Sequence, residues 1–265
     1  MRFRILGPLR VCSRGQWVHV AAEQQRVVLA VLLVRAGRSV GTDTLIGALW
    51  GECPPRTATN TLQVYVSRLR RLVGAEVLTT RQGGYELAVG DDDIDAGVFE
   101  RAVRRGRREL AAGRPARAET ALGQALALWD TPAPVLADVP PTPWVDALAA
   151  QLEQLRLGAV EDHAEARLQL GRHADLAEEL DHLAREHPLR ERRWALLMTA
   201  LERGGRRAEA LEAYQRARRV LREELGLEPG RQLRELQQDI LADDHGDGRR
   251  RRFGSPAGLA SPPDS

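Results

Sequence analysis

Residues 56–73 read RTATNTLQVYVSRLRRLV, and their polar side chains recur at intervals of three and four positions. On an α-helix this spacing brings side chains to one face. That face collects Thr57, Asn60, Val64, Ser67, Arg68 and Arg71, with Gln63 at its edge. Arginine, amide and hydroxyl groups are those that contact phosphates and base edges in a DNA major groove. For this segment alone, the alternative is an ordinary surface helix with a solvated charged face.

The opposite face of this predicted helix is apolar and is expected to be buried. Its members are Ala58, Leu62, Tyr65, Val66, Leu69 and Val73. Pro54 and Pro55 stand directly before the segment, where proline is tolerated at a helix start. Gly74 stands directly after it, where glycine favours helix termination. The sequence therefore predicts a bounded amphipathic helix with one side free to bind.

The candidate DNA contacts on this helix are not equivalent. The stronger candidates are Arg68, Arg71 and Asn60, and the weaker ones are Gln63, Ser67 and Thr57. A cap at the helix N-terminus explains Thr57 as well as a phosphate contact does. Val64 lies in the middle of the face, where it either contacts a thymine methyl or packs on a transactivation loop or the second domain. Arg70 lies at the edge, where it either contacts a phosphate or is simply solvated.

The elements around this helix predict a winged helix. We expect short strands within 2–12 and 16–20, helices at 23–36 and 42–50, and a hairpin formed by 76–80 and 85–89. Thr42 is expected to cap the second helix. Three helices followed by a hairpin place the third helix in the major groove and the hairpin beside it on the DNA backbone or in the minor groove. Arg81, at the hairpin tip, is therefore a further predicted DNA contact.

Charge is unevenly distributed along the 265 residues. Residues 1–90 contain 12 arginines and five acidic residues, a net charge of +7, whereas residues 91–242 contain 23 arginines and 28 acidic residues, a net charge of −5. The last 23 residues are balanced, which leaves the total at +2. The first part is thus suited to a polyanion and the second is not.

The second part is predicted to be helical. A proline-rich loop at 131–143 precedes helices at about 144–170, 173–186, 190–203 and 207–225. The pattern Gly-Arg-x-Ala begins at Gly171 and again at Gly205, which is the 34-residue period of tetratricopeptide helix pairs. Stacked pairs of this kind form a concave surface for another protein. A plain helical bundle is the alternative, but spacing and residue type together favour the repeat.

Several segments also carry a resemblance. GPLRV, QQRVVLAVLL, DTLIGALWGE, TNTLQVYVSRLRRLVG and LTTRQGGYEL resemble the OmpR-type DNA-binding domain of the Streptomyces antibiotic regulatory protein (SARP) family. Residues 221–241, LREELGLEPGRQLRELQQDIL, resemble the end of the bacterial transcriptional activation domain of the same regulators. The resemblance covers about residues 1–242.

We therefore predict a mainly α protein with a small β component. Its parts are an OmpR-like winged helix-turn-helix domain at 1–92, an all-α tetratricopeptide-like activation domain at 96–242 and a disordered tail at 243–265. The resemblance implies a sequence-specific transcriptional activator of an antibiotic (secondary-metabolite) gene cluster. It further implies binding of double-stranded promoter DNA at direct repeats near the −35 region, as a homodimer, with recruitment of RNA polymerase holoenzyme. The alternatives are a helical-repeat scaffold or a repressor whose winged helix contacts a partner.

Other classes of function lack sequence support. No GxSxG, HExxH, dinucleotide-binding or GxxxxGK[ST] pattern occurs, so we expect no catalysis and no cofactor. Cys12 and Cys53 fit neither a disulfide framework nor a metal site. No receiver domain precedes the winged helix, so aspartyl phosphorylation is not supported. No apolar run of membrane-spanning length or signal peptide is present, which predicts a cytoplasmic, nucleoid-associated protein without membrane contact. Arg249–Arg252 are expected to be solvated.

Overall fold

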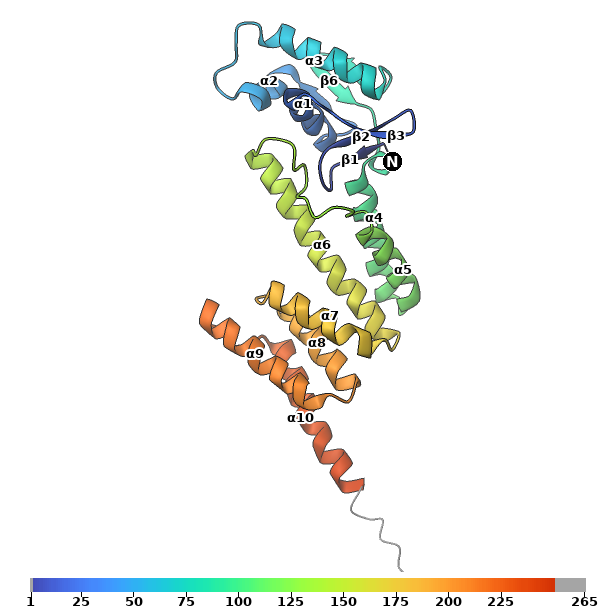
Figure 1. Cartoon of the computed structure of the whole chain (residues 1–265), viewed down its shortest axis with the longest axis vertical. Coiled ribbons are helices and arrows are strands. Elements are labelled where there is room, and N and C mark those ends of the chain that lie inside the picture. Colours follow the sequence, from blue (N-terminus) through green and yellow to red (C-terminus); the bar gives the residue numbers. More distant parts are fainter. Residues whose placement is uncertain (1, 251–265) are drawn as a thin grey trace, which may run out of the picture. The chain divides into compact units, whose positions relative to one another are not determined.

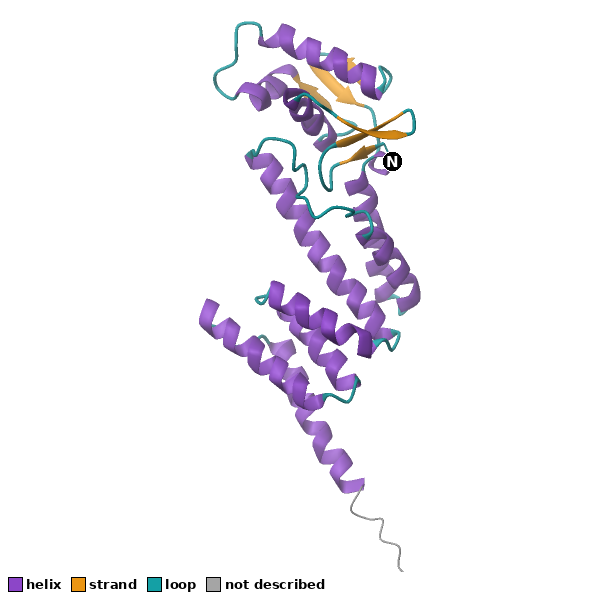
Figure 2. Cartoon of the chain, in the orientation of Figure 1, coloured by secondary structure: helices purple, strands orange, loops and turns teal. Residues whose placement is uncertain are grey.

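The computed structural model describes residues 2–250, and side chains as far as residue 242. The chain forms two compact units, residues 1–166 and 167–265. Within the described residues, every strand belongs to the first unit (Figure 2). A mainly helical protein with small sheets, containing a winged helix and a helical repeat region, confirms the predicted fold class.

The first unit contains the elements of the expected winged helix (Figure 1). In chain order they are β1 (Phe3–Arg4), β2 (Arg10–Ser13), β3 (Gln16–His19), α1 (Glu23–Val34), β4 (Ser39–Gly41), α2 (Thr42–Trp50), α3 (Ala58–Val73), β5 (Leu78–Arg81) and β6 (Gly84–Leu87). The 3₁₀ turn η1 (Asp91–Asp93) then leads to α4 (Asp95–Ala111), α5 (Pro115–Leu126) and α6 (Pro143–Gln169), which continues into the second unit.

Two small antiparallel sheets flank the helices. The first has the order β1-β2-β3 and the second the order β4-β6-β5, in which β5 and β6 form the wing. The wing turns at Gln82-Gly83, and Gly83 has a φ of +77°, a conformation that glycine adopts without strain. The next residue is also a glycine. Any side chain at Gly84 would place its Cβ 2.0 Å from the carbonyl oxygen of Val40, which is too close. The two glycines thus allow β4 to close onto the wing.

The core of the winged helix is aliphatic, as its low aromatic content requires. Helix α1 is buried from Val27 to Leu33, because its sequence is apolar on nearly every side. Against it pack the fully buried Leu45 of α2, Leu62 and Leu69 of α3, and Leu78 and Leu87 of the wing. Burying one such leucine stabilises the fold by about 1.5–3 kcal/mol. This packing fixes which side of α3 is left exposed.

Thr42 does not cap α2. It is the first helical residue, and Gly41 occupies the cap position without a side-chain hydrogen bond. The Thr42 hydroxyl instead donates to the carbonyl oxygen of Gly83 at 3.2 Å, and its backbone N–H donates to the same oxygen at 3.0 Å. The capping prediction was wrong because the wing turn, 41 positions away in the chain, offers the hydroxyl an acceptor.

The proline-rich loop packs onto the first sheet rather than merely connecting helices. The backbone N–H of Leu136 donates to the carbonyl oxygen of Ile5 at 3.0 Å, and Leu136 is fully buried. The N–H of Leu9 donates to Oδ1 of Asp138 at 2.7 Å, and Arg26 Nε donates to the Asp138 carbonyl at 2.6 Å. These contacts join the loop, β1–β2 and α1 in one core.

Asp95, the first residue of α4, joins this helix to the same sheet. It is buried, and its carboxylate accepts backbone N–H groups of Ile5 at 2.8 Å, Leu6 at 3.1 Å and Ala96 at 2.8 Å. Burial raises the pKa of Asp95 to about 6, and the three backbone donors and the charge of Arg4 oppose that rise. The carboxylate therefore holds helix and sheet together through backbone hydrogen bonds.

The second unit contains the helices α7 (His173–Glu186), α8 (Glu191–Arg203), α9 (Arg207–Leu225) and α10 (Arg231–Arg250), and α8 packs against the other three. Gly171 and Gly205, the two repeat glycines, have φ values of +82° and +73°. The N–H of Arg172 donates to the carbonyl of Arg167, and that of Arg206 to the carbonyl of Leu201, five positions back in both cases. Such bonds with a left-handed glycine form the Schellman end of a helix. The repeated motif therefore encodes a repeated helix–turn–helix.

The predicted tail falls largely outside the description. Helix α10 extends to Arg250, while residues 251–265 lie outside the described residues. The side chains of Arg249–Arg252 lie outside them as well.

Candidate nucleic-acid interface

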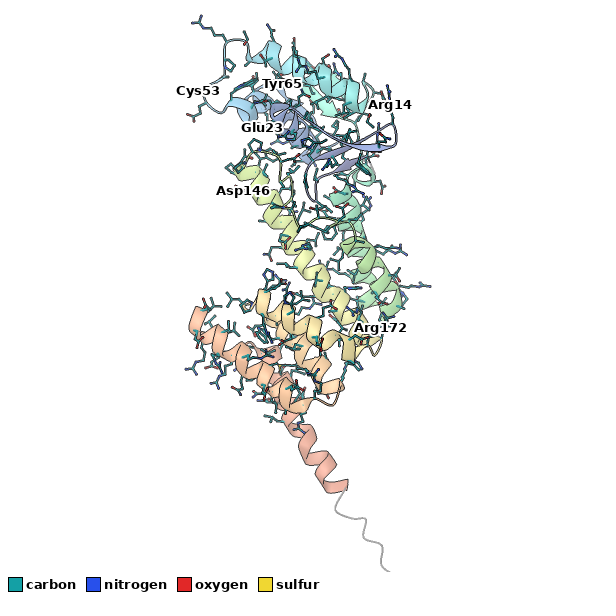
Figure 3. The ribbon with its side chains drawn as sticks, viewed as in Figure 1. Arg14, Glu23, Cys53, Tyr65, Asp146 and Arg172 are labelled. Carbon is teal, nitrogen blue, oxygen red and sulfur yellow. The ribbon has the colours of Figure 1, made fainter. Side chains whose placement is uncertain are left out.

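Helix α3 presents the whole predicted binding face to solvent. Its buried residues are Ala58, Leu62, Val66, Leu69 and Val73, and Tyr65 is half-buried. Its exposed residues include Asn60, Gln63, Val64, Ser67, Arg68 and Arg71, and Thr57 just before the helix is exposed too. Figure 3 shows the side chains that project from this helix, with Tyr65 labelled. The amphipathic pattern therefore predicts the orientation of the helix correctly.

The two arginines ranked highest are free to bind. Within the described residues, neither Arg68 nor Arg71 makes a hydrogen bond or an ion pair. No acidic residue lies between Ala58 and Val73, so no carboxylate on the helix offsets their charge. An exposed guanidinium without a partner binds a phosphate or a guanine edge without first breaking an internal ion pair. Arg68 and Arg71 thus make this face electropositive.

Thr57 occupies the N-cap position of α3, but its hydroxyl makes no capping hydrogen bond. Its carbonyl oxygen accepts from both the backbone N–H of Thr61, at 2.9 Å, and the Thr61 hydroxyl, at 3.0 Å. Thr57 therefore stands at the cap position considered from the sequence, but it caps the helix without a side-chain hydrogen bond. The hydroxyl of Thr57 remains available to an external acceptor.

Arg70 connects α3 to the wing. Its Nε donates to the carbonyl oxygen of Leu78 at 2.8 Å, its Nη2 donates to the hydroxyl of Thr80 at 2.6 Å, and its guanidinium lies 5.9 Å from the centre of the Tyr85 ring. Arg70 is therefore held against the wing, a contact that neither interpretation from the sequence included. No local pattern reveals this role, because it depends on where β5 returns to the helix.

Arg81, the predicted wing contact, lies at the end of β5 and is half exposed. Its Nε donates to Oε2 of Glu86 on the adjacent strand at 2.6 Å. The hydrogen bond and the charge of Arg81 lower the pKa of Glu86, so the glutamate is ionised at neutral pH. Arg81 is thus held across the hairpin, and its positive charge is partly offset, unlike that of Arg68 and Arg71.

We next consider whether the described residues could form a disulfide, a metal site or a membrane-spanning helix. Cys12 and Cys53 are free thiols. Among residues with described side chains, no group of three or more His, Cys, Asp or Glu residues is arranged to hold a metal ion. None of the helices within residues 2–250 combines the length and the apolar character needed to cross a bilayer.

Two family models match the chain. The model described as "Transcriptional regulatory protein, C terminal" matches residues 18–87, which contain α3 and the wing. The model described as "Bacterial transcriptional activator domain" matches residues 94–241, more than half of the chain. The first match ends at residue 87 and the second begins at residue 94, so the two do not overlap.

Characterised relatives match over nearly the whole chain. The regulatory protein DnrI of Streptomyces peucetius is 39% identical over 257 residues, which cover 93% of this chain and 94% of DnrI. The regulatory protein AfsR of Streptomyces griseus is 41% identical over 244 residues, which cover 92% of this chain and 25% of AfsR. The chain therefore spans about a quarter of the length of AfsR but nearly all of DnrI.

A solved structure is similar to this one over most of the chain. The structure of Mycobacterium tuberculosis EmbR in complex with a low-affinity phosphopeptide matches with a TM-score of 0.85 and 37% sequence identity. The match covers 91% of this chain and 65% of the EmbR chain.

Proposed function

The chain belongs to the Streptomyces antibiotic regulatory protein family of transcriptional regulators, and on that premise we propose that it activates an antibiotic (secondary-metabolite) gene cluster by binding promoter DNA. The observation that supports this function best is the exposed face of α3, where two arginines with no partner among the described residues lie among amide and hydroxyl side chains. In a winged helix this face is the one that enters the major groove.

Each predicted residue then has a role in the proposed complex. Arg68, Arg71 and Asn60 contact base edges, because guanidinium and amide groups form paired hydrogen bonds with guanine and adenine. Thr57, Gln63 and Ser67 contact phosphates or bases at the margin of the face. Arg81 contacts the sugar–phosphate backbone or the minor groove from the wing. We propose residues 1–92 as the DNA-binding domain.

The proposed partners follow from the family. Two copies occupy direct repeats near the −35 region, and residues 96–242 contact RNA polymerase holoenzyme; the tail at 243–265 takes no part. The second unit offers a surface for such a contact, a groove of about 410 Å³ between α7, α8 and α9. Leu197 and Leu201 line it together with the charged Asp181, Arg185 and Arg216. We place the protein in the cytoplasm, on the nucleoid.

Footprinting of the full chain on the promoters of its own gene neighbourhood tests the proposal. Protection of two repeats near a −35 element is expected, with log Kd changing linearly with log salt by about 0.9 per phosphate contacted. A template carrying one repeat alone is the control and should bind more weakly. A scaffold that uses its winged helix only for protein contact would protect no site on any of these promoters. Run-off transcription with holoenzyme then distinguishes an activator from a repressor.

A further inference from the structure

Val64 is an apolar residue in the middle of the exposed face of α3. Its exposed fraction is 48%, whereas Val66 and Val73 of the same helix are 1% and 5% exposed. Those two valines belong to the core of the winged helix, and Val64 does not. Valine is also a weaker helix former than alanine or leucine, because its branched side chain is restricted on a helix. Neither packing within its own unit nor helix stability therefore accounts for it.

Val64 is surrounded by side chains that are proposed to contact DNA. Asn60 precedes it by four positions, Ser67 and Arg68 follow by three and four, and Arg71 follows by seven. Residues at these spacings surround Val64 on one helix face. Any surface that all four polar side chains contact therefore also covers Val64. If that surface is the floor of the major groove, Val64 faces a base edge, and its side chain has no group that could form a hydrogen bond with that edge.

The major groove presents one apolar feature to such a side chain, the 5-methyl group of thymine. We propose that Val64 selects thymine at one position of each repeat by contacting this methyl group, between the bases contacted by Asn60 and Arg71. This inference rests on the proposed DNA-binding function and adds the chemical group that the centre of the face recognises. A cytosine or guanine there would place polar groups against the valine and leave them without hydrogen bonds.

Deoxyuridine tests the contact, because it differs from thymidine only by the missing methyl group. In a DNA fragment with footprinted repeats, each thymidine is replaced in turn and the Kd of the full chain is measured. One position per repeat is expected to lose affinity about fourfold, the equivalent of one buried methyl(ene) group. Replacing cytosine by 5-methylcytosine in a variant fragment with a G·C pair at that position should restore part of the affinity.

Val64→Ala completes the test as a double-mutant cycle. The variant should bind the thymidine fragment several-fold more weakly than the wild type and show no further loss on the deoxyuridine fragment. Val34→Ala is the matched control, because Val34 is 43% exposed and is the last residue of α1 rather than part of α3. It should leave both affinities unchanged, and thermal unfolding should show that both variants are folded.

The inference is wrong if the wild type binds every deoxyuridine fragment as tightly as the thymidine fragment. It is also wrong if Val64→Ala leaves binding unchanged or loses the same factor on both fragments, as expected of a valine that contacts protein instead. Failure of the proposed function gives a different result, since no fragment would then be bound by the wild type.

Discussion

Arginine serves different purposes on helix α3 and in the second unit. Arg68 and Arg71 of α3 have no partner among the described residues. In the second unit, Arg206 donates to both oxygens of Glu209 at 2.8 and 2.6 Å, and Arg218 donates to a glutamate of the α9–α10 loop at 2.6 Å. Arg206 and Arg218 are therefore engaged by glutamates, whereas Arg68 and Arg71 remain available to a ligand.

This comparison explains why net charge alone is a weak guide to binding. The pairing lowers the pKa of Glu209 through its hydrogen bond with Arg206, so both groups stay charged but offset each other. Exposed pairs of this type contribute little to stability, and they add little to the field that a polyanion meets. A free arginine adds its full charge to that field.

The double variant Arg68→Ala/Arg71→Ala should produce the largest effect on DNA binding. Each lost base contact costs about 1–3 kcal/mol, so the pair should weaken specific binding by about 2–6 kcal/mol and reduce the salt dependence. The matched control is Arg206→Ala/Arg218→Ala, which removes the same number of arginines from the second unit. If the control weakened promoter binding as much in gel-shift titrations, the distinction between free and paired arginines would be lost.

Asp95 extends the comparison to an acidic side chain, because it is buried and forms no ion pair with any described residue. Its pKa is about 6 in the folded chain against 3.8 for an exposed aspartate. As pH rises, the Asp95 carboxyl therefore loses its proton in the unfolded chain before it does so in the folded chain. The free energy of unfolding then falls between about pH 4 and pH 6. At 1.36 kcal/mol per pKa unit, the fall is at most about 3 kcal/mol.

Urea unfolding at pH 4.5 and pH 7 measures this effect against Asp95→Asn, which does not titrate. The stability of the wild type relative to Asp95→Asn should decrease as pH rises. A difference that instead increases with pH would mean that the three backbone donors outweigh burial and hold the carboxylate ionised.

Arg70→Met should produce the smallest effect, because it leaves the free arginines unchanged and removes only the connection between α3 and the wing. Two hydrogen bonds are lost at about 1 kcal/mol each, so stability should fall slightly and DNA binding several-fold. The informative measurement is a double-mutant cycle with Arg81→Ala. Arg81→Ala should weaken binding in the wild type and have no further effect in Arg70→Met. Equal effects in both backgrounds would show that Arg70 does not position the wing.

Elements that depend on a local pattern can be predicted from the sequence. Helix α3 and its exposed face follow from side chains three and four positions apart, and the hairpin follows from two runs around a glycine turn. The turns at Gly171 and Gly205 follow from residues within five positions of each glycine. Each of these depends on near neighbours, which the sequence displays directly.

Contacts between distant segments could not be predicted, because they depend on how the whole unit folds. Thr42 bonds to the wing turn 41 positions away, and Asp138 of the proline-rich loop bonds to Leu9 across 129 positions. Leu136 adopts a positive φ of 53°, which is rare for leucine and here accompanies its burial against the first sheet. Nothing in the local pattern specifies these partners, because hydrogen-bond acceptors and apolar surface far along the chain become neighbours only once the core has formed.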